Sequence, residues 1–143
     1  MLVKEVMSKN VVSAPPEIST QEAAKLLNDN GIGCLVIASK DRLLGILTER
    51  DIVIKLVMDN LSAAKTPISK IMTKNPVLIE EDAEISDAVE AMVQNKIKRL
   101  PVVSGHTLVG IITTSDIAAA GPKEAERVSQ LMVSPKRIRA MAG

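Results

Sequence analysis

The chain contains one segment twice: Leu43-Leu44-Gly45-Ile46-Leu47-Thr48-Glu49-Arg50-Asp51-Ile52-Val53 recurs 65 positions later as Leu108-Val109-Gly110-Ile111-Ile112-Thr113-Thr114-Ser115-Asp116-Ile117-Ala118. In both copies a strand-like apolar run ends in a threonine, and an aspartate follows three positions later. The same offset, without a gap, also pairs Met7 with Met72, Asn30 with Asn95 and Leu35 with Leu100. Repetition at a fixed offset is typical of a repeated structural unit. We therefore predict a tandem of one unit of about fifty residues.

Length and charge narrow the class of protein. A chain of 143 residues is suited to one compact domain, which buries roughly 70% of the surface of its unfolded form. Units of about fifty residues are marginal alone, so we expect the two to share a core about a pseudo-twofold axis. The net charge of +1 gives no overall field that would favour nucleic acid or an anionic membrane.

The composition also excludes several functions. Without Phe, Tyr or Trp, the chain lacks the aromatic platforms on which single-stranded nucleic acids stack. One cysteine, Cys34, and one histidine, His106, supply neither a disulfide nor a catalytic or metal-binding set, and Cys34 is predicted to be a buried thiol. No signal peptide or membrane span is apparent. The sequence therefore predicts a soluble cytoplasmic protein that is not an enzyme.

Apolar periodicity and turn residues predict the same order of elements in both halves: strand, helix, strand, strand, helix. Ser19 begins the first helix and Asn30-Gly31 ends it. The predicted strands are 11–14, 34–38 and 43–47, then 77–79, 100–103 and 109–113, and the other helices are 86–95, those following Thr48 and Ser115, and 123–132. The residues expected to face inward are Ala23, Leu26, Leu27, Ile52, Val53, Leu56 and Val57, then Ala88, Val89, Met92 and Val93.

These elements define a domain organisation. The first unit covers residues 1–60, a linker 61–69, the second unit 70–120, and a helix with a basic tail 121–143. The predicted fold class is α/β (α+β), with two β-α-β-β-α units.

The repeated threonine and aspartate are suited to hold an anion or a polyol. A hydroxyl at the end of a strand and a carboxylate in the first turn of the next helix both lie beside unpaired backbone amides. A carboxylate can accept hydrogen bonds from both hydroxyls of a ribose, and helix-start amides suit a phosphate. The alternative is that Thr48 and Thr113 only cap helices and that Asp51 and Asp116 only complement the helix dipole. The recurrence of the whole set at one spacing favours a ligand.

The strand before each threonine has a glycine and an isoleucine that fit the same interpretation. Gly45 and Gly110, without side chains, would let a flat group approach the strand. Ile46 and Ile111 would form apolar walls beside that group.

The motifs resemble those of the cystathionine β-synthase (CBS) domain family, in which glycine, two apolar residues, Ser/Thr, any residue, Ser/Thr and Asp follow one another. Gly110-Ile111-Ile112-Thr113-Thr114-Ser115-Asp116 matches throughout, whereas the first copy departs at Arg50. Three further segments also resemble the family: Val6-Met7-Ser8, Ile71-Met72-Thr73 and Arg99-Leu100-Pro101-Val102-Val103. The resemblance covers about residues 1 to 120.

The resemblance implies a regulatory module that binds AMP, ADP, ATP or S-adenosylmethionine in clefts between its two units. Asp51 and Asp116 would hold the ribose, and Thr48, Thr113 and Ser115 would contact ribose or phosphate. The remaining expected contacts are the backbone of Val12, Ser13, Ala14, Val77, Leu78 and Ile79 with the adenine edge, and the side chains of Lys98 and Arg99 with the phosphates. The first unit has Gly33 and Cys34 at the positions of Lys98 and Arg99, so one cleft lacks this charge. Arg50 either supplies it or points to solvent.

The leading hypothesis is a homodimer that senses an adenine nucleotide and modulates an unknown partner protein allosterically. The alternative is a non-catalytic interaction protein of the same fold with degenerate clefts. It would act through dimerisation, or through its basic tail on a protein or nucleic acid. The residues 136–139, Lys-Arg-Ile-Arg, either contact such a partner or fray. Which ligand binds, and whether both clefts are filled, the sequence leaves open.

Overall fold

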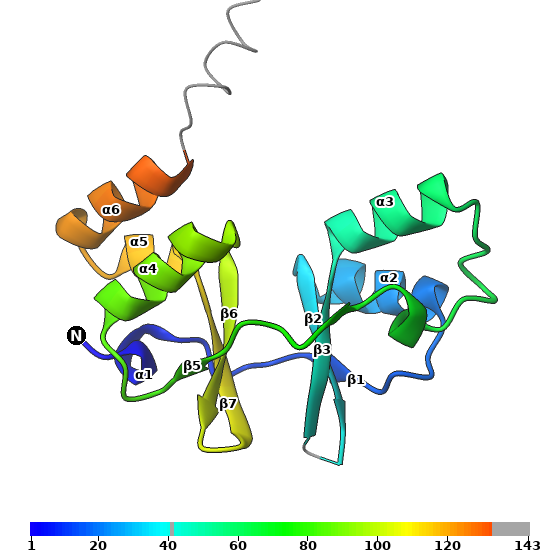
Figure 1. The fold of residues 1–143 in the computed structure, drawn as a ribbon, viewed down its shortest axis with the longest axis horizontal. Coiled ribbons are helices and arrows are strands. Elements are labelled where there is room, and N and C mark those ends of the chain that lie inside the picture. The colour runs from blue at the N-terminus through cyan, green and yellow to red at the C-terminus, as the bar shows by residue number, and fades with distance from the viewer. Residues whose placement is uncertain (41, 133–143) are drawn as a thin grey trace, which may run out of the picture. The chain divides into compact units, whose positions relative to one another are not determined.

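The computed structural model describes residues 1–40 and 42–132, which form two β-sheets and six α-helices in a mixed α/β fold (Figure 1). The basic tail lies outside the described residues. The chain divides into two compact units. We call residues 10–76 with 106–108 the Asp51 unit, and residues 1–9, 77–105 and those from 109 onward the Asp116 unit. No helix among the described residues is long and apolar enough to cross a membrane.

The Asp51 unit is built on a four-stranded sheet in the order β1-β2-β3-β4. Its strands are β1 (Ser13–Ala14), β2 (Cys34–Ser39), β3 (Arg42–Thr48) and β4 (Thr73–Lys74), and its helices are α2 (Thr20–Asn30), α3 (Glu49–Met58) and the 3-10 helix η1 (Ile68–Lys70). β1 runs parallel to β2, whereas β2, β3 and β4 pair antiparallel. The predicted limits of α2 are confirmed, because the Ser19 side chain accepts from the Glu22 amide at 3.1 Å and Gly31 ends the helix at φ 60°.

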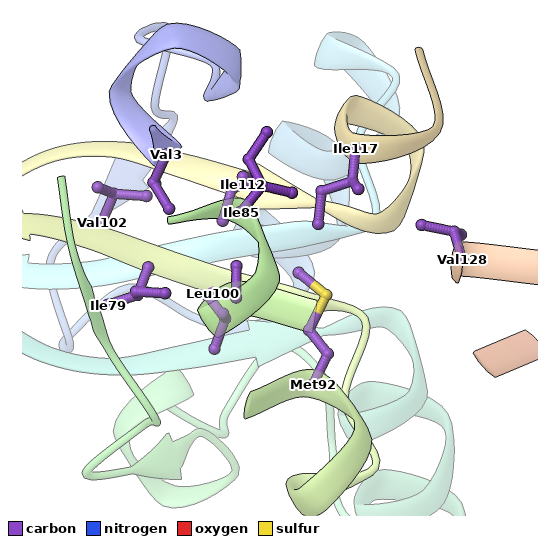
Figure 2. Close-up of a cluster of buried hydrophobic side chains, with 10 residues drawn as sticks. Val3, Ile79, Ile85, Met92, Leu100, Val102, Ile112, Ile117 and Val128 are labelled. Carbon is purple, nitrogen blue, oxygen red and sulfur yellow. The ribbon is translucent and has the colours of Figure 1, made fainter. Parts of the chain in front are cut away.

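The Asp116 unit repeats this order on a three-stranded sheet, β5-β6-β7. Its elements are α1 (Val3–Val6), β5 (Ile79–Glu80), α4 (Ile85–Asn95), β6 (Arg99–Ser104), β7 (Thr107–Thr113, from residue 109 onward), α5 (Thr114–Ala119) and α6 (Pro122–Met132). Figure 2 shows the core of this unit, in which Val3 and Val128, from distant parts of the chain, join one cluster. The other labelled members are Ile79, Ile85, Met92, Leu100, Val102, Ile112 and Ile117.

The residues that lead into the first strand of each repeat pack in the core of the other repeat. Val3 is fully buried among residues of the second repeat, and its amide donates to the Ala83 carbonyl at 2.8 Å. Ile68, 65 positions later, is fully buried in the core of the Asp51 unit. In the same segment, Lys4 Nζ donates to Asp82 Oδ1 at 2.9 Å. This hydrogen bond and the negative charge of Asp82 raise the pKa of Lys4 above its ordinary value. The boundaries of the compact units therefore differ from those of the sequence repeats.

Three residues expected to face inward do not. Val53, Val57 and Val93 are 61%, 73% and 50% exposed. A surface helix buries one stripe of its circumference, and on α3 that stripe contains the buried Leu56 and the partly buried Ile52. Val53 and Val57 lie one helical turn apart outside it. The inward positions of Ala23, Leu26, Leu27, Ala88, Val89 and Met92 are confirmed.

Candidate ligand-binding site

The first repeated threonine and aspartate meet at the N-terminus of α3. The Thr48 side chain accepts a hydrogen bond from the Asp51 amide at 3.1 Å, and Asp51 Oδ2 accepts from the Thr48 amide at 3.1 Å. This reciprocal pair is a capping box, which satisfies two helix-start donors. Thr48 and Asp51 therefore do cap the helix, as the alternative interpretation expected. Asp51 remains partly accessible, with 16% of its side chain exposed.

The second pair has the same geometry at the N-terminus of α5. Thr113 accepts from the Asp116 amide at 3.1 Å, and Asp116 Oδ2 accepts from the Thr113 amide at 2.9 Å. Asp116 is half-buried. Its other oxygen, Oδ1, has neither a hydrogen bond nor an ion pair within residues 1–40 and 42–132. A half-buried carboxylate oxygen at a helix N-terminus is placed to accept further hydrogen bonds from a hydroxyl-bearing ligand.

The residue before β6 lies next to the start of α5, and the residue before β2 lies next to the start of α3. The Thr114 amide donates to the Lys98 carbonyl at 3.0 Å, and at the equivalent place the Glu49 amide donates to the Gly33 carbonyl at 3.2 Å. The exposed Lys98 is thus close in the backbone to the Asp116 motif. The neighbouring Arg99 is half-buried. The first repeat has no cation at this position, as the sequence indicated.

The space that a side chain would take at each of the two glycines is filled by the chain itself. A Cβ on Gly45 would lie 2.6 Å from the Thr73 carbonyl oxygen and 2.9 Å from Met72 Sδ. At Gly110 the equivalent atoms are the Ser8 carbonyl oxygen and Met7 Sδ, each at 2.7 Å. The absence of a side chain at each glycine therefore lets the chain's own Met-Thr or Met-Ser segment pack closely against the strand.

The isoleucines that follow these glycines also differ in their exposure. Ile46 is buried, at 8% exposed, whereas Ile111 is half-buried. Of the two expected apolar walls, the one at Ile111 is the more accessible.

The strands expected to read adenine share a sheet with the motif of the same unit. β1 pairs with β2 through Ser13 and Val36, and β2 lies between β1 and β3. The Val12 carbonyl accepts from the Val36 amide at 3.2 Å, and Ala14 is buried. In the Asp116 unit, Ile79 pairs with Val102, Val77 is partly buried and Leu78 is 43% exposed.

The remaining expected contacts lie at the surface. Arg50 and Ser115 occupy equivalent positions in the first turns of α3 and α5, and both are exposed. The Arg50 side chain has no hydrogen bond or ion pair with any part of the chain that the structure describes.

Two side chains at the first site were missed from the sequence. Thr73 Oγ1 donates to Asp51 Oδ2 at 3.5 Å, and Lys55 Nζ lies 3.7 Å from Asp51 Oδ1. The equivalence of Thr73 and Ser8, both hydroxyl residues after a repeated methionine, could have indicated the first. The spacing of Asp51 and Lys55, four residues apart on one helix, could have indicated the second. Elsewhere, Cys34 is buried, as expected, and the described residues hold no cluster of three or more metal-binding side chains.

The chain is similar to known proteins over most of its length. A family model for the CBS domain matches residues 3–57 and 68–123. An uncharacterised protein of Methanopyrus kandleri is 38% identical over 122 residues, which cover 84% of this chain and 62% of that protein. The CBS domain-containing protein YhcV of Bacillus subtilis is 33% identical over 116 residues, covering 81% of this chain and 82% of YhcV.

A solved structure is similar over the same region. It is the CBS domain pair of protein MJ0100, in complex with 5′-methylthioadenosine and S-adenosyl-L-methionine. It superposes with a TM-score of 0.76 at 35% identity, covering 84% of this chain and 94% of that one.

Proposed function

Because the chain belongs to the CBS domain family, we propose that it binds an adenosine-containing ligand and thereby regulates a partner protein. The observation that carries the proposal is Asp116, whose Oδ1 is unpaired within the described residues although the carboxylate is half-buried at a helix start. The adenosyl ligands in the MJ0100 structure support this class of ligand.

In this proposal each residue has a distinct role. Asp116 accepts hydrogen bonds from the ribose hydroxyls, while Thr113 and Ser115 contact ribose or phosphate. Lys98, whose carbonyl is bonded to the helix start, supplies positive charge to a phosphate, as does Arg99. The equivalent groups of the first repeat are Thr48 and Asp51, with Arg50 as the nearby cation.

The regulatory step follows from linkage. A ligand shifts an equilibrium between two arrangements only if it binds one of them more tightly. We propose that AMP, ADP, ATP or S-adenosylmethionine does this here, and that the favoured arrangement alters the activity of the partner.

A ligand panel tests the proposal directly. AMP, ADP, ATP and S-adenosylmethionine are each added to the protein while its melting temperature is measured. A ligand at 100 times its Kd stabilises the folded state by about 2.7 kcal/mol, which raises the melting temperature by several degrees. The absence of a shift with every ligand up to about 1 mM would reject sensing and favour the interaction protein.

A substitution locates the site. Asp116→Ala removes two charge-assisted hydrogen bonds and is expected to weaken binding by about 2 to 4 kcal/mol, or roughly 30- to 1,000-fold, in calorimetry. The matched control is Asp87→Ala on α4, because Asp87 Oδ2 makes the same capping bond to the Glu84 amide at 3.1 Å. The control loses a helix cap but keeps its affinity. Equal affinity in both variants would contradict the assignment of Asp116.

The exposed face of α3 supports a homodimer as part of this proposal. Val53, Ile54, Val57 and Met58 are 61%, 37%, 73% and 77% exposed. Contiguous apolar surface of this kind is typical of interaction sites.

Val57→Asp, which would bury a charge in that contact, should raise the dimer dissociation constant at least about 100-fold. Sedimentation would then show the mass of one chain. Ser86→Asp, at an exposed position on α4, adds the same charge and should stay dimeric. A monomeric wild-type protein would contradict the dimer.

A further inference from the structure

Both oxygens of the Asp51 carboxylate already have partners in the chain. Oδ2 accepts from the Thr48 amide at 3.1 Å and from the Thr73 hydroxyl at 3.5 Å. Oδ1 lies 3.7 Å from Lys55 Nζ, one helical turn further along α3. Lys55 in turn donates to the Ile71 carbonyl at 2.7 Å. Lys55 therefore joins the carboxylate to the chain segment that leads into β4.

The second repeat lacks this arrangement. An offset of 65 places Ala120 at the position of Lys55, and an alanine side chain has no donor. The two capping boxes otherwise agree, with both threonine-to-aspartate distances 3.1 Å in the first and 2.9 and 3.1 Å in the second. Asp51 thus has two side-chain partners that Asp116 lacks, Thr73 on Oδ2 and Lys55 on Oδ1, and only Lys55 occupies the oxygen that in Asp116 has no partner among the described residues.

We propose that Lys55 makes the two sites unequal by occupying the Asp51 oxygen that a ribose would need. This inference rests on the proposed function and adds the order in which the sites fill. A diol that binds Asp51 must displace Lys55 from Oδ1, whereas at Asp116 it meets an oxygen without a partner. The Asp116 site fills first, and the Asp51 site binds the same ligand more weakly.

The size of the effect follows from the exposure of the pair. The side chains of Lys55 and Asp51 are 40% and 16% exposed, so solvent screens part of their attraction. Removing the lysine is expected to tighten binding at Asp51 about two- to tenfold.

The test uses 5′-methylthioadenosine, which has adenine and the ribose diol but no phosphate that Lys55 could bind directly. It is titrated calorimetrically into wild-type protein, Asp116→Ala, and Asp116→Ala with Lys55→Met, so that the last two report the Asp51 site. The added Lys55→Met should lower the Kd by about two- to tenfold. Lys25→Met, on the exposed face of α2, is the control and should leave the Kd unchanged.

The outcomes separate this inference from the proposed function. If the wild-type protein binds none of 5′-methylthioadenosine, AMP, ADP, ATP and S-adenosylmethionine, the proposed function fails and the inference fails with it. If it binds but Lys55→Met leaves the Kd unchanged or raises it, the inference alone is overturned. Weaker AMP binding in Lys55→Met, with unchanged 5′-methylthioadenosine binding, would instead make Lys55 a phosphate ligand.

A measurement without ligand checks the contact itself. Urea unfolding of Asp51→Asn, Lys55→Met and the double variant should give a coupling of about twofold in the unfolding equilibrium constant. Strict additivity would overturn the proposed contact, whatever the ligand data show.

Discussion

The last helices of the two repeats begin with the same motif and continue differently. α3 runs without interruption from Glu49 to Met58, and its outer face is apolar and exposed. α5 ends at Ala119, and Pro122, at the position equivalent to Val57, begins α6. Proline has no amide hydrogen and cannot continue the hydrogen-bond pattern of a helix. α6 instead packs on α5 and buries Val128 in the core. The break after α5 thus lets α6 cover the core of the second repeat, whereas the apolar outer face of α3 stays exposed.

The largest expected effect compares equivalent isoleucines in these helices. Ile117 on α5 is fully buried, and Ile52 on α3 is partly buried. Ile117→Ala should lower the free energy of unfolding by about 2 to 5 kcal/mol. Ile52→Ala should lower it by about 1 to 2 kcal/mol, because less of the Ile52 side chain is buried away from water in the folded protein. Urea unfolding measures both, and equal losses would show that the two helices are equally well covered.

The pattern of the sequence was sufficient for the order of elements but not for this difference. Strands, helices and the ends of α2 followed from apolar periodicity and from Ser19 and Gly31. Val53 and Val57 were placed inward because a helix with apolar residues on two faces has no single stripe that periodicity can select.

The candidate site was predictable only in part. The helix-start positions of Thr48, Asp51, Thr113 and Asp116 followed from the repeat. The contact of Lys55 with the Ile71 carbonyl could not be predicted, because every residue has a backbone carbonyl and the sequence does not indicate which one a lysine will bind. β4 is two residues long and exposed, so no alternation marked it.

An intermediate effect is expected at the glycines, where the repeats should behave alike. Gly45→Ala and Gly110→Ala each place a Cβ within 2.7 Å of a backbone carbonyl oxygen. Each should destabilise the protein by about 1 to 3 kcal/mol, because the packed segment must shift. Thermal unfolding compares them with Gly121→Ala, whose nearest contact is the flexible Glu124 side chain at 3.1 Å. A neutral result at Gly45 or Gly110 would show that the adjoining Met-Thr or Met-Ser segment moves freely.

The smallest effect concerns the helix that closes the second repeat. Val128 is 4% exposed, and Val128→Ala removes two methyl groups from the core. It should cost about 1 to 2 kcal/mol in urea unfolding. Ser129→Ala, at the exposed neighbouring position, should change stability by less than about 0.5 kcal/mol. If both variants unfold like the wild-type protein, α6 does not close the core and the contrast with α3 disappears.

Residues 1–9 belong to the Asp116 unit although they precede the Asp51 unit in the chain. This affects the order in which the two units can fold during synthesis. Residues 10–76, with η1 and β4, are synthesised before most of the second repeat, so the core around Ile68 can form early. Val3 is synthesised before all of the residues that bury it, and these extend to Val128. Residues 1–9 therefore wait for α6 before the core around Val3 is complete, and deleting them would leave a hole in the core of the Asp116 unit.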